Sequence, residues 1–134
     1  MEVNFSLNEI TSAAVNLLAE AGRYKVFAFH GDMGAGKTTT IAALIQAAQV
    51  EHFEGSPTFA IIQPYDSPTK AKIYHLDCYR IENEAELINL GLEELFDEAA
   101  FFFVEWPEKI KQILTSLDIK VNNVTETGIG MTIP

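Results

Sequence analysis

Two short stretches of the chain, residues 26–29 (VFAF) and 99–104 (AAFFFV), are apolar at every position. Short apolar runs rich in aromatic and β-branched residues predict buried strands, and the first has the character of a strand in a parallel sheet. Four further stretches predict strands in two pairs: residues 59–63 with 71–76, and residues 118–123 with 129–133. Residues 64–69 have the composition of a hairpin loop and are expected to join the first pair.

Helices are predicted both before and after the first of these strands in the sequence. After residues 26–29, apolar side chains recur at i, i+3, i+4 and i+7, which predicts a helix that begins near Lys37. These side chains are Ile41, Leu44, Ile45 and Ala48. Before the strand, residues 6–9 have the S-x-x-E form of a capping box and predict a helix over residues 7–21, with Gly22 as its end.

The second half of the chain repeats the alternation of strand and helix. Residues 82–90 and 92–96 predict two acidic helices, expected to cover one edge of the sheet, and a short helix is expected to end at Leu114. Alternating strands and helices predict an α/β fold in which helices flank a mostly parallel central sheet. With 134 residues, 48% of them hydrophobic, the chain is expected to form a single domain over residues 1–134.

The segment between the first strand and its helix, residues 31–38 (GDMGAGKT), fits the pattern G-x-x-x-x-G-K-[ST] at every defined position. In the order strand, glycine loop and helix, backbone N–H groups wrap a polyphosphate while the helix N-terminus adds partial positive charge. The chain is therefore predicted to bind a nucleotide on a three-layer phosphate-loop NTPase fold. The alternative is a glycine-rich turn with a solvated lysine, and the flanking strand and helix argue against it.

Individual residues of this loop have predicted roles. Gly34 and Gly36 let the backbone approach phosphate oxygens because no Cβ stands in the way. Lys37 is placed to reach the β- and γ-phosphates, and the Thr38 hydroxyl is the predicted ligand of a bound Mg²⁺.

A turn-rich segment follows the helix, and Ser56 and Thr58 lie within it. In phosphate-loop NTPases the loop at this place can carry a threonine that responds to Mg²⁺ and the γ-phosphate, so both residues are candidates. A hydroxyl group that caps a proline turn is an equally good interpretation.

Two carboxylates stand at the ends of predicted strands, Asp77 after residues 71–76 and Glu105 after residues 99–104. Ligands of open α/β sheets bind at the carboxyl ends of the strands, so Asp77 is placed to order a water or a Mg²⁺-bound ligand. Glu105 closes a segment of the Walker B form, although Asp is commoner there, and a solvated glutamate is the alternative. His75 is interpreted as a structural histidine, because no third metal ligand lies near it in the sequence.

Charge and cysteine content limit the function. Nine Lys and Arg against nineteen Asp and Glu give a net charge of −10, which repels a nucleic-acid backbone, so direct nucleic-acid binding is not expected. Cys78 is the only cysteine and is expected to be a small buried hydrophobe. No apolar run has the length of a membrane span and residues 1–4 lack the features of a signal peptide, so a cytoplasmic location without membrane contact is expected.

Four segments together resemble the TsaE family of bacterial ATPases, formerly YjeE, which take part in making threonylcarbamoyladenosine in tRNA. They are residues 31–39 (GDMGAGKTT), 56–59 (SPTF), 74–80 (YHLDCYR) and 104–108 (VEWPE). The resemblance implies a phosphate-loop ATPase fold and slow ATP hydrolysis in the company of the TsaB and TsaD proteins. It also implies that tRNA is contacted only indirectly, through these partners.

The resemblance further implies roles for particular residues. ATP is expected to be bound by Gly34, Ala35, Gly36, Lys37, Thr38 and Thr39. Thr38 and Glu105 are implied to hold Mg²⁺, and catalysis is assigned to Lys37, Asp77 and Glu105, with either carboxylate as the group that orders the attacking water. Thr11 is implied to lie near the nucleotide, whereas its spacing alone indicates a threonine on a helix surface.

Three other functions use the same loop. A small-molecule kinase would transfer phosphate to a substrate other than water, but kinases of this size clamp the phosphate with several arginines, and the chain has only Arg23 and Arg80. A GTPase is disfavoured because no N-K-x-D-type segment follows the loop. A binding switch that is ordered by nucleotide without turning it over shares every residue named above.

Overall fold

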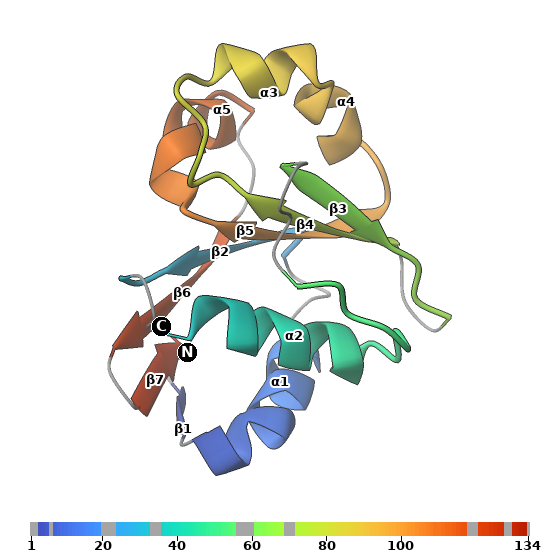
Figure 1. Ribbon diagram of the computed structural model, residues 1–134, viewed down its shortest axis with the longest axis vertical. Helices are drawn as coiled ribbons and strands as arrows, with labels where there is room; N and C mark the ends of the chain where they lie inside the picture. Colours follow the sequence, from blue (N-terminus) through green and yellow to red (C-terminus); the bar gives the residue numbers. More distant parts are fainter. Residues whose placement is uncertain are drawn as a thin grey trace.

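The apolar stretches predicted as strands lie side by side at the centre of one sheet (Figure 1). The computed structural model describes residues 3–5, 7–19, 24–32, 36–55, 61–68, 72–117, 121–127 and 130–133. Within these ranges seven strands pair in the spatial order β1-β7-β6-β2-β5-β4-β3. Their bounds are β1 Val3–Phe5, β2 Val26–His30, β3 Ile62–Tyr65, β4 Lys72–Asp77, β5 Ala100–Glu105, β6 Val121–Thr127 and β7 Gly130–Ile133.

Four neighbouring strands run parallel. β2 pairs with β6 on one side and β5 on the other, and β5 pairs with β4. The strands outside this group, β1, β3 and β7, pair antiparallel. The predicted α/β class with a mostly parallel sheet is therefore confirmed, and the carboxyl ends of β2, β4 and β5 meet at one edge.

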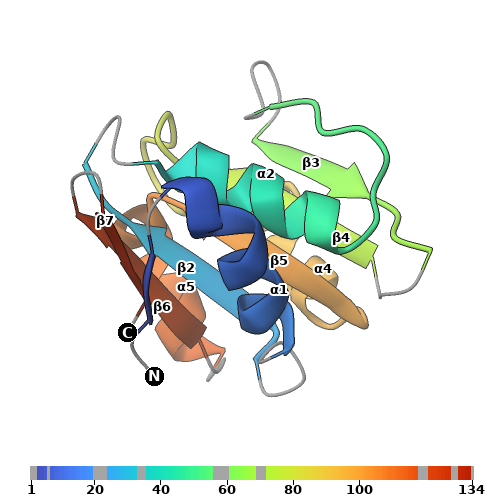
Figure 2. The ribbon, with the colours of Figure 1, turned by 90° about the horizontal axis from the view of Figure 1, so that it is seen from below.

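Helices cover both faces of the sheet, which gives three layers (Figures 1 and 2). On one face lie α1 (Ile10–Ala19), which follows the 3₁₀ turn η1 (Leu7–Glu9), and α2 (Lys37–Ala47). On the other lie α3 (Ala85–Asn89), α4 (Leu92–Phe96), the 3₁₀ turn η3 (Pro107–Ile110) and α5 (Lys111–Ser116). Each face has its own buried core, with Leu17, Ile41, Phe27 and Phe103 in the first and Leu76, Leu87, Phe102 and Val104 in the second.

The two acidic helices lie elsewhere than predicted, and the first is also shorter than predicted, whereas α4 spans the predicted residues 92–96. The helix predicted over residues 82–90 is only α3, which begins after its N-cap residue Glu84, and the Glu84 side chain accepts hydrogen bonds from the first turn of α5. Gly91, with φ 83°, then adopts the left-handed conformation that separates α3 from α4. Leu87 and Leu92 pack beneath the sheet, so α3 and α4 cover a face rather than an edge.

Three other boundaries differ from their predictions. The strand predicted over residues 118–123 is described as Val121–Thr127, and residues 118–120 lie outside the described residues. Pro64 was expected in the hairpin loop but lies within β3, opposite Tyr74 of β4. Among the described strands β3 is the last at its edge of the sheet and pairs with β4 alone, and an edge strand tolerates a residue without an N–H group. The helix predicted over residues 7–21 begins with the 3₁₀ turn and is described as far as Ala19, while its expected end at Gly22 lies outside the described residues.

Cys78 is buried, as predicted, and burial raises the pKa of its thiol above the ordinary value. Across the described ranges, no helix combines the length and apolar character that crossing a membrane requires.

Candidate functional site

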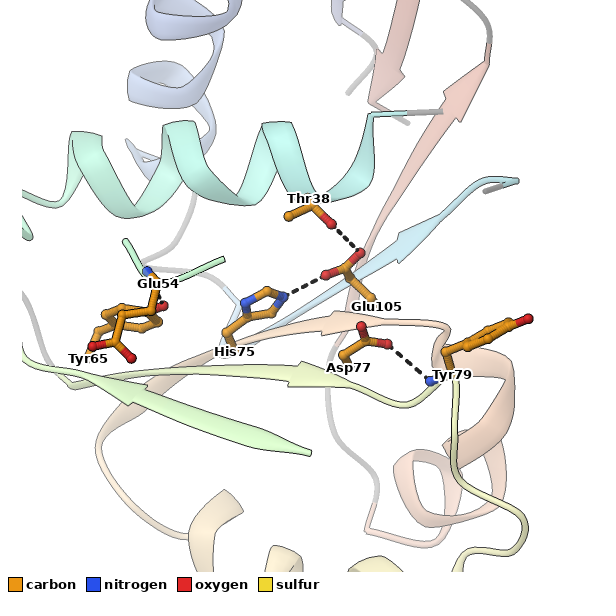
Figure 3. A network of polar contacts seen from close by, with 7 residues as sticks. All are labelled: Thr38, Glu54, Tyr65, His75, Asp77, Tyr79 and Glu105. Carbon is orange, nitrogen blue, oxygen red and sulfur yellow. Dashed lines mark hydrogen bonds and ion pairs between the residues drawn. The ribbon is translucent and has the colours of Figure 1, made fainter. Parts of the chain in front are cut away.

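The carboxyl ends of two adjacent parallel strands bring two acidic residues together. Asp77 ends β4 and Glu105 ends β5, and the two residues are partners in the register of the sheet. The first turn of α2 lies above them (Figure 3). This turn follows Gly36, whose φ of 106° is left-handed and suits glycine, so the chain can leave the loop and enter the helix within one residue. The site is therefore built from three elements of the central fold.

Thr38 and Glu105 form the centre of this site. The Thr38 hydroxyl donates a hydrogen bond to Oε1 of Glu105 at 3.0 Å. Neighbouring ligands of an octahedral Mg²⁺, each about 2.0–2.1 Å from the ion, lie about 2.9 Å apart, so these two oxygens already have the separation of adjacent ligands. Hydroxyl and carboxylate oxygens are also the donors that Mg²⁺ prefers. The two residues therefore fit the ion assigned to them from the sequence.

The remaining ligands of such an ion would come from elsewhere. In the part of the chain that the structure describes, no group of three or more His, Cys, Asp and Glu residues gathers as a metal cage. A Mg²⁺ ion that is bound with a nucleotide keeps several waters and uses phosphate oxygens beside one or two protein ligands.

His75 holds the other oxygen of the same carboxylate. Its Nε2 lies 2.7 Å from Oε2 of Glu105, and both side chains are buried. Phe53 stacks on the imidazole ring, with 6.0 Å between ring centroids. Glu105 is thus held between α2 and β4, with one oxygen toward each (Figure 3).

Asp77 lies beside this pair and is less buried. Its Oδ1 accepts a hydrogen bond from the backbone N–H of Tyr79 at 3.1 Å. Partial burial raises the pKa of the Asp77 carboxyl above its ordinary value, and the negative charge of Glu105 acts in the same direction. The Tyr79 hydrogen bond opposes this rise, as does the positive charge of Arg80. A carboxylate with a raised pKa at a strand end suits proton transfer or the ordering of water.

Lys37 is the cation of the site, and it is buried. Its Nζ donates hydrogen bonds to the backbone carbonyls of Gly31 and Asp32 and lies 3.9 Å from the ring centre of Trp106. Trp106 directly follows Glu105 and has φ 58°, a left-handed conformation that is rare for a bulky residue. The ammonium group is therefore held between the loop and the end of β5 by contacts that phosphate oxygens can replace.

The structure brings together several residues predicted from the sequence. Lys37, Thr38, Asp77 and Glu105 converge, and Gly36 and Thr39 flank the start of α2. Thr11 is exposed on α1. Four predicted residues, Gly34, Ala35, Ser56 and Thr58, lie outside the described residues. The roles of all these residues in binding and catalysis remain predictions.

Sequence reasoning missed two members of the site. His75 was interpreted as structural, and its burial agrees with that, but its contact with Glu105 was not predicted. The signal lay in the alternation of β4, where Ile73 and His75 share a side and an apolar residue would be expected. Trp106 had no assigned role, and its contact with Lys37 depends on a turn that spacing does not reveal.

Comparisons with known proteins show which family the chain is similar to. Residues 5–130 match the model of a family described as "Threonylcarbamoyl adenosine biosynthesis protein TsaE". A relative from Haemophilus influenzae, named tRNA threonylcarbamoyladenosine biosynthesis protein TsaE, is 37% identical over 93 residues, which cover 69% of this chain and 58% of the relative. A relative of the same name from Bacillus subtilis is 38% identical over 114 residues, which cover 78% of this chain and 70% of the relative.

These relatives are longer than the region they share with this chain, which spans between 58% and 70% of their lengths. A solved structure supports the fold independently. The crystal structure of YdiB from Bacillus subtilis superposes with a TM-score of 0.67 over 99% of this chain and 84% of that chain, at 24% sequence identity. At that identity the likeness supports the fold alone.

Proposed function

The chain belongs to the TsaE family, and from that premise we propose that it binds ATP with Mg²⁺, hydrolyses ATP slowly, and works with the TsaB and TsaD proteins in the threonylcarbamoyladenosine modification of tRNA. The single observation that carries the proposal is the 3.0 Å contact between Thr38 and Glu105. It joins the helix that follows the glycine loop to the strand of Walker B form, which is the pairing that a Mg²⁺-nucleotide site requires.

Binding is assigned to the loop and the start of α2. Backbone N–H groups near Gly36 and the N-terminus of α2 would hold the phosphates, and the buried Lys37 would exchange its carbonyl partners for the β- and γ-phosphates. Thr38 and Glu105 would hold the Mg²⁺ ion, which neutralises charge that builds up on the phosphates during transfer.

Hydrolysis is assigned to Asp77. Both oxygens of Glu105 already have partners, Thr38 and His75, whereas Asp77 lies next to them in the register of the sheet. From there its carboxylate would orient the water that attacks the γ-phosphorus, and the bond to the bridging oxygen of ADP would break. Partial burial fits this task, because it raises the pKa of Asp77 and makes the carboxylate a better proton acceptor.

The charge of the chain supports an indirect relation to tRNA. A net charge of −10 disfavours contact with the phosphate backbone, so partner proteins are proposed to bind the RNA while ATP turnover resets their complex. The same proposal gives the protein a cytoplasmic location and one domain over residues 1–134.

Phosphate release from ATP tests the proposal. The protein is measured alone, with TsaB and TsaD, and with EDTA in place of Mg²⁺. We expect slow release alone, faster release with the partners, and none in EDTA. Lys37→Ala is the control, because losing a charge-assisted contact weakens ATP binding by roughly 10- to 100-fold. Phosphate release at background, both with and without the partners, would contradict the proposed ATPase activity and favour a binding switch. A pull-down of the partners that depends on nucleotide would then identify such a switch.

A further inference from the structure

His75 is a polar residue at an apolar position. Side chains alternate along β4, so Ile73 and His75 face the layer of α1 and α2 while Tyr74 and Leu76 face the other core. His75 is completely buried. Burying an imidazole in an apolar layer is costly unless the ring is hydrogen-bonded, so its partner must compensate for the lost water.

That partner is Glu105, and the geometry defines which ring nitrogen carries hydrogen. Nε2 lies 2.7 Å from the carboxylate, whereas Nδ1 is buried and has no hydrogen-bond partner among the described residues. A buried N–H group without an acceptor costs more than a bare ring nitrogen without a donor, so the hydrogen belongs on Nε2. The ring thus donates to Glu105 in a single tautomer.

The ring is also fixed in orientation. Phe53 stacks on His75 at an interplanar angle of 25° and on Tyr65 at 26°. Tyr65 in turn accepts a hydrogen bond from the backbone N–H of Glu54 at 3.0 Å (Figure 3). The imidazole is therefore clamped by the segment that follows α2, and it cannot rotate away from the carboxylate without disturbing these rings.

From these contacts we propose that His75 is a positioning residue that fixes the rotamer of Glu105, so that Oε1 points at the Thr38 hydroxyl and the Mg²⁺ position. The proposal rests on the proposed function and deepens it. One hydrogen bond holds Oε2 to β4 and the other directs Oε1 to α2, so losing the first frees the carboxylate to turn. Groups that orient a metal ligand in this way change metal affinity by about 10- to 100-fold.

A pair of substitutions separates the hydrogen bond from packing. His75→Met fills the space without a donor, and His75→Gln places an amide N–H near the position of Nε2. Binding of the non-hydrolysable analogue AMP-PNP is measured by calorimetry against Mg²⁺ concentration and again in EDTA. His52→Met, at an exposed histidine, is the matched control.

We expect His75→Met to weaken Mg²⁺ binding by about 10- to 100-fold, with AMP-PNP affinity in EDTA unchanged, and His75→Gln to restore most of the loss. Unchanged Mg²⁺ affinity in His75→Met would overturn the proposal. An equal loss of AMP-PNP affinity in EDTA would also overturn it, because the defect would then lie in the phosphate loop. If the wild-type protein bound no AMP-PNP with Mg²⁺, the proposed function would fail first, and the positioning role with it.

A spectroscopic measurement tests the same point without a substitution at His75. Nitrogen-15 NMR of the three histidines distinguishes the two imidazole tautomers. We expect His75 to carry its hydrogen on Nε2 and its signal to shift in Glu105→Gln. Hydrogen on Nδ1, or a signal that ignores Glu105→Gln, would overturn the proposal even if His75→Met did not fold.

Discussion

β4 and β5 have two sides that serve different purposes. On the side of α3, α4 and α5, Leu76 and Val104 are completely buried in an apolar core. On the side of α2, the positions nearest the carboxyl ends are polar instead, with His75, Asp77 and Glu105 in place of apolar residues. Because neighbouring residues of a strand face opposite ways, the two purposes alternate along the chain, and a substitution one residue away reports on a different property.

Polar contacts also occur on the apolar side, but they lie at its margins. The Tyr74 hydroxyl donates to Glu98 at 3.0 Å, and Glu84 accepts hydrogen bonds at the start of α5. These contacts satisfy hydroxyl and backbone groups that packing would otherwise leave without partners. The polar side instead brings two carboxylates, Asp77 and Glu105, next to each other, an arrangement that favours a bound cation more than it favours stability.

The largest expected effect comes from Asp77 on the polar side. Asp77→Asn keeps an oxygen for the Tyr79 N–H but removes the charge, so kcat for ATP hydrolysis should fall by about 10²- to 10⁴-fold while AMP-PNP affinity stays near wild type. Glu108→Gln, at an exposed carboxylate, is the control and should retain turnover. If Asp77→Asn hydrolysed ATP at the wild-type rate, the catalytic role would belong to a group other than Asp77.

The adjacent position, Leu76, should behave in the opposite way. Leu76→Ala leaves a cavity on the apolar side and should lower the free energy of unfolding by about 2–5 kcal/mol, measured by urea denaturation. Molecules that remain folded should still bind AMP-PNP. Ile88→Ala, at a residue 47% exposed on α3, should change stability by less than about 0.5 kcal/mol. If Leu76→Ala reduced nucleotide affinity without loss of stability, the two sides would not be separate.

The sequence alone predicted those parts of the fold that depend on local pattern. The apolar run before Glu105 and the period of α2 each lie within a few residues, and the structure has β5 and α2 close to where they were expected. The fold class followed from the same alternation of strands and helices. Asp77 was also placed correctly at the end of its strand.

Contacts between distant segments could not be predicted in this way. The hydrogen bond from His75 to Glu105 joins residues 30 positions apart and depends on the parallel register of β4 with β5. The contact of Glu84 with the first turn of α5 joins residues 28 and 29 positions apart, and local propensity does not contain it. Pro64 in β3 depends on that strand lying at an edge, which is a property of the whole sheet.

A smaller effect is expected from Glu84, on the apolar side. Its carboxylate accepts hydrogen bonds from the backbone N–H groups of Gln112 at 3.1 Å and Ile113 at 3.2 Å, which are unpaired donors of the first turn of α5. It therefore acts as a helix cap from another segment, and Glu84→Ala should destabilise the protein by about 1 kcal/mol. Glu84→Gln keeps an acceptor and should lose less in the same urea titration. Equal losses in the two variants would assign the effect to charge rather than to capping.

The smallest effect should be the pH dependence of stability that Asp77 contributes. Burial raises the pKa of the folded Asp77 above its ordinary value, so the folded chain releases this proton at a higher pH than the unfolded chain. The stability that the Asp77 carboxyl contributes is therefore fully present when the pH is below its ordinary pKa, and it is lost as the pH rises through the raised pKa. In EDTA, Asp77→Asn should unfold at a higher temperature than wild type near about pH 7, and the difference should close as pH falls toward about pH 3.5. Because the carboxylate is partly solvated, the difference should stay small, and a difference that is constant with pH would show that the charge of Asp77 is not its source.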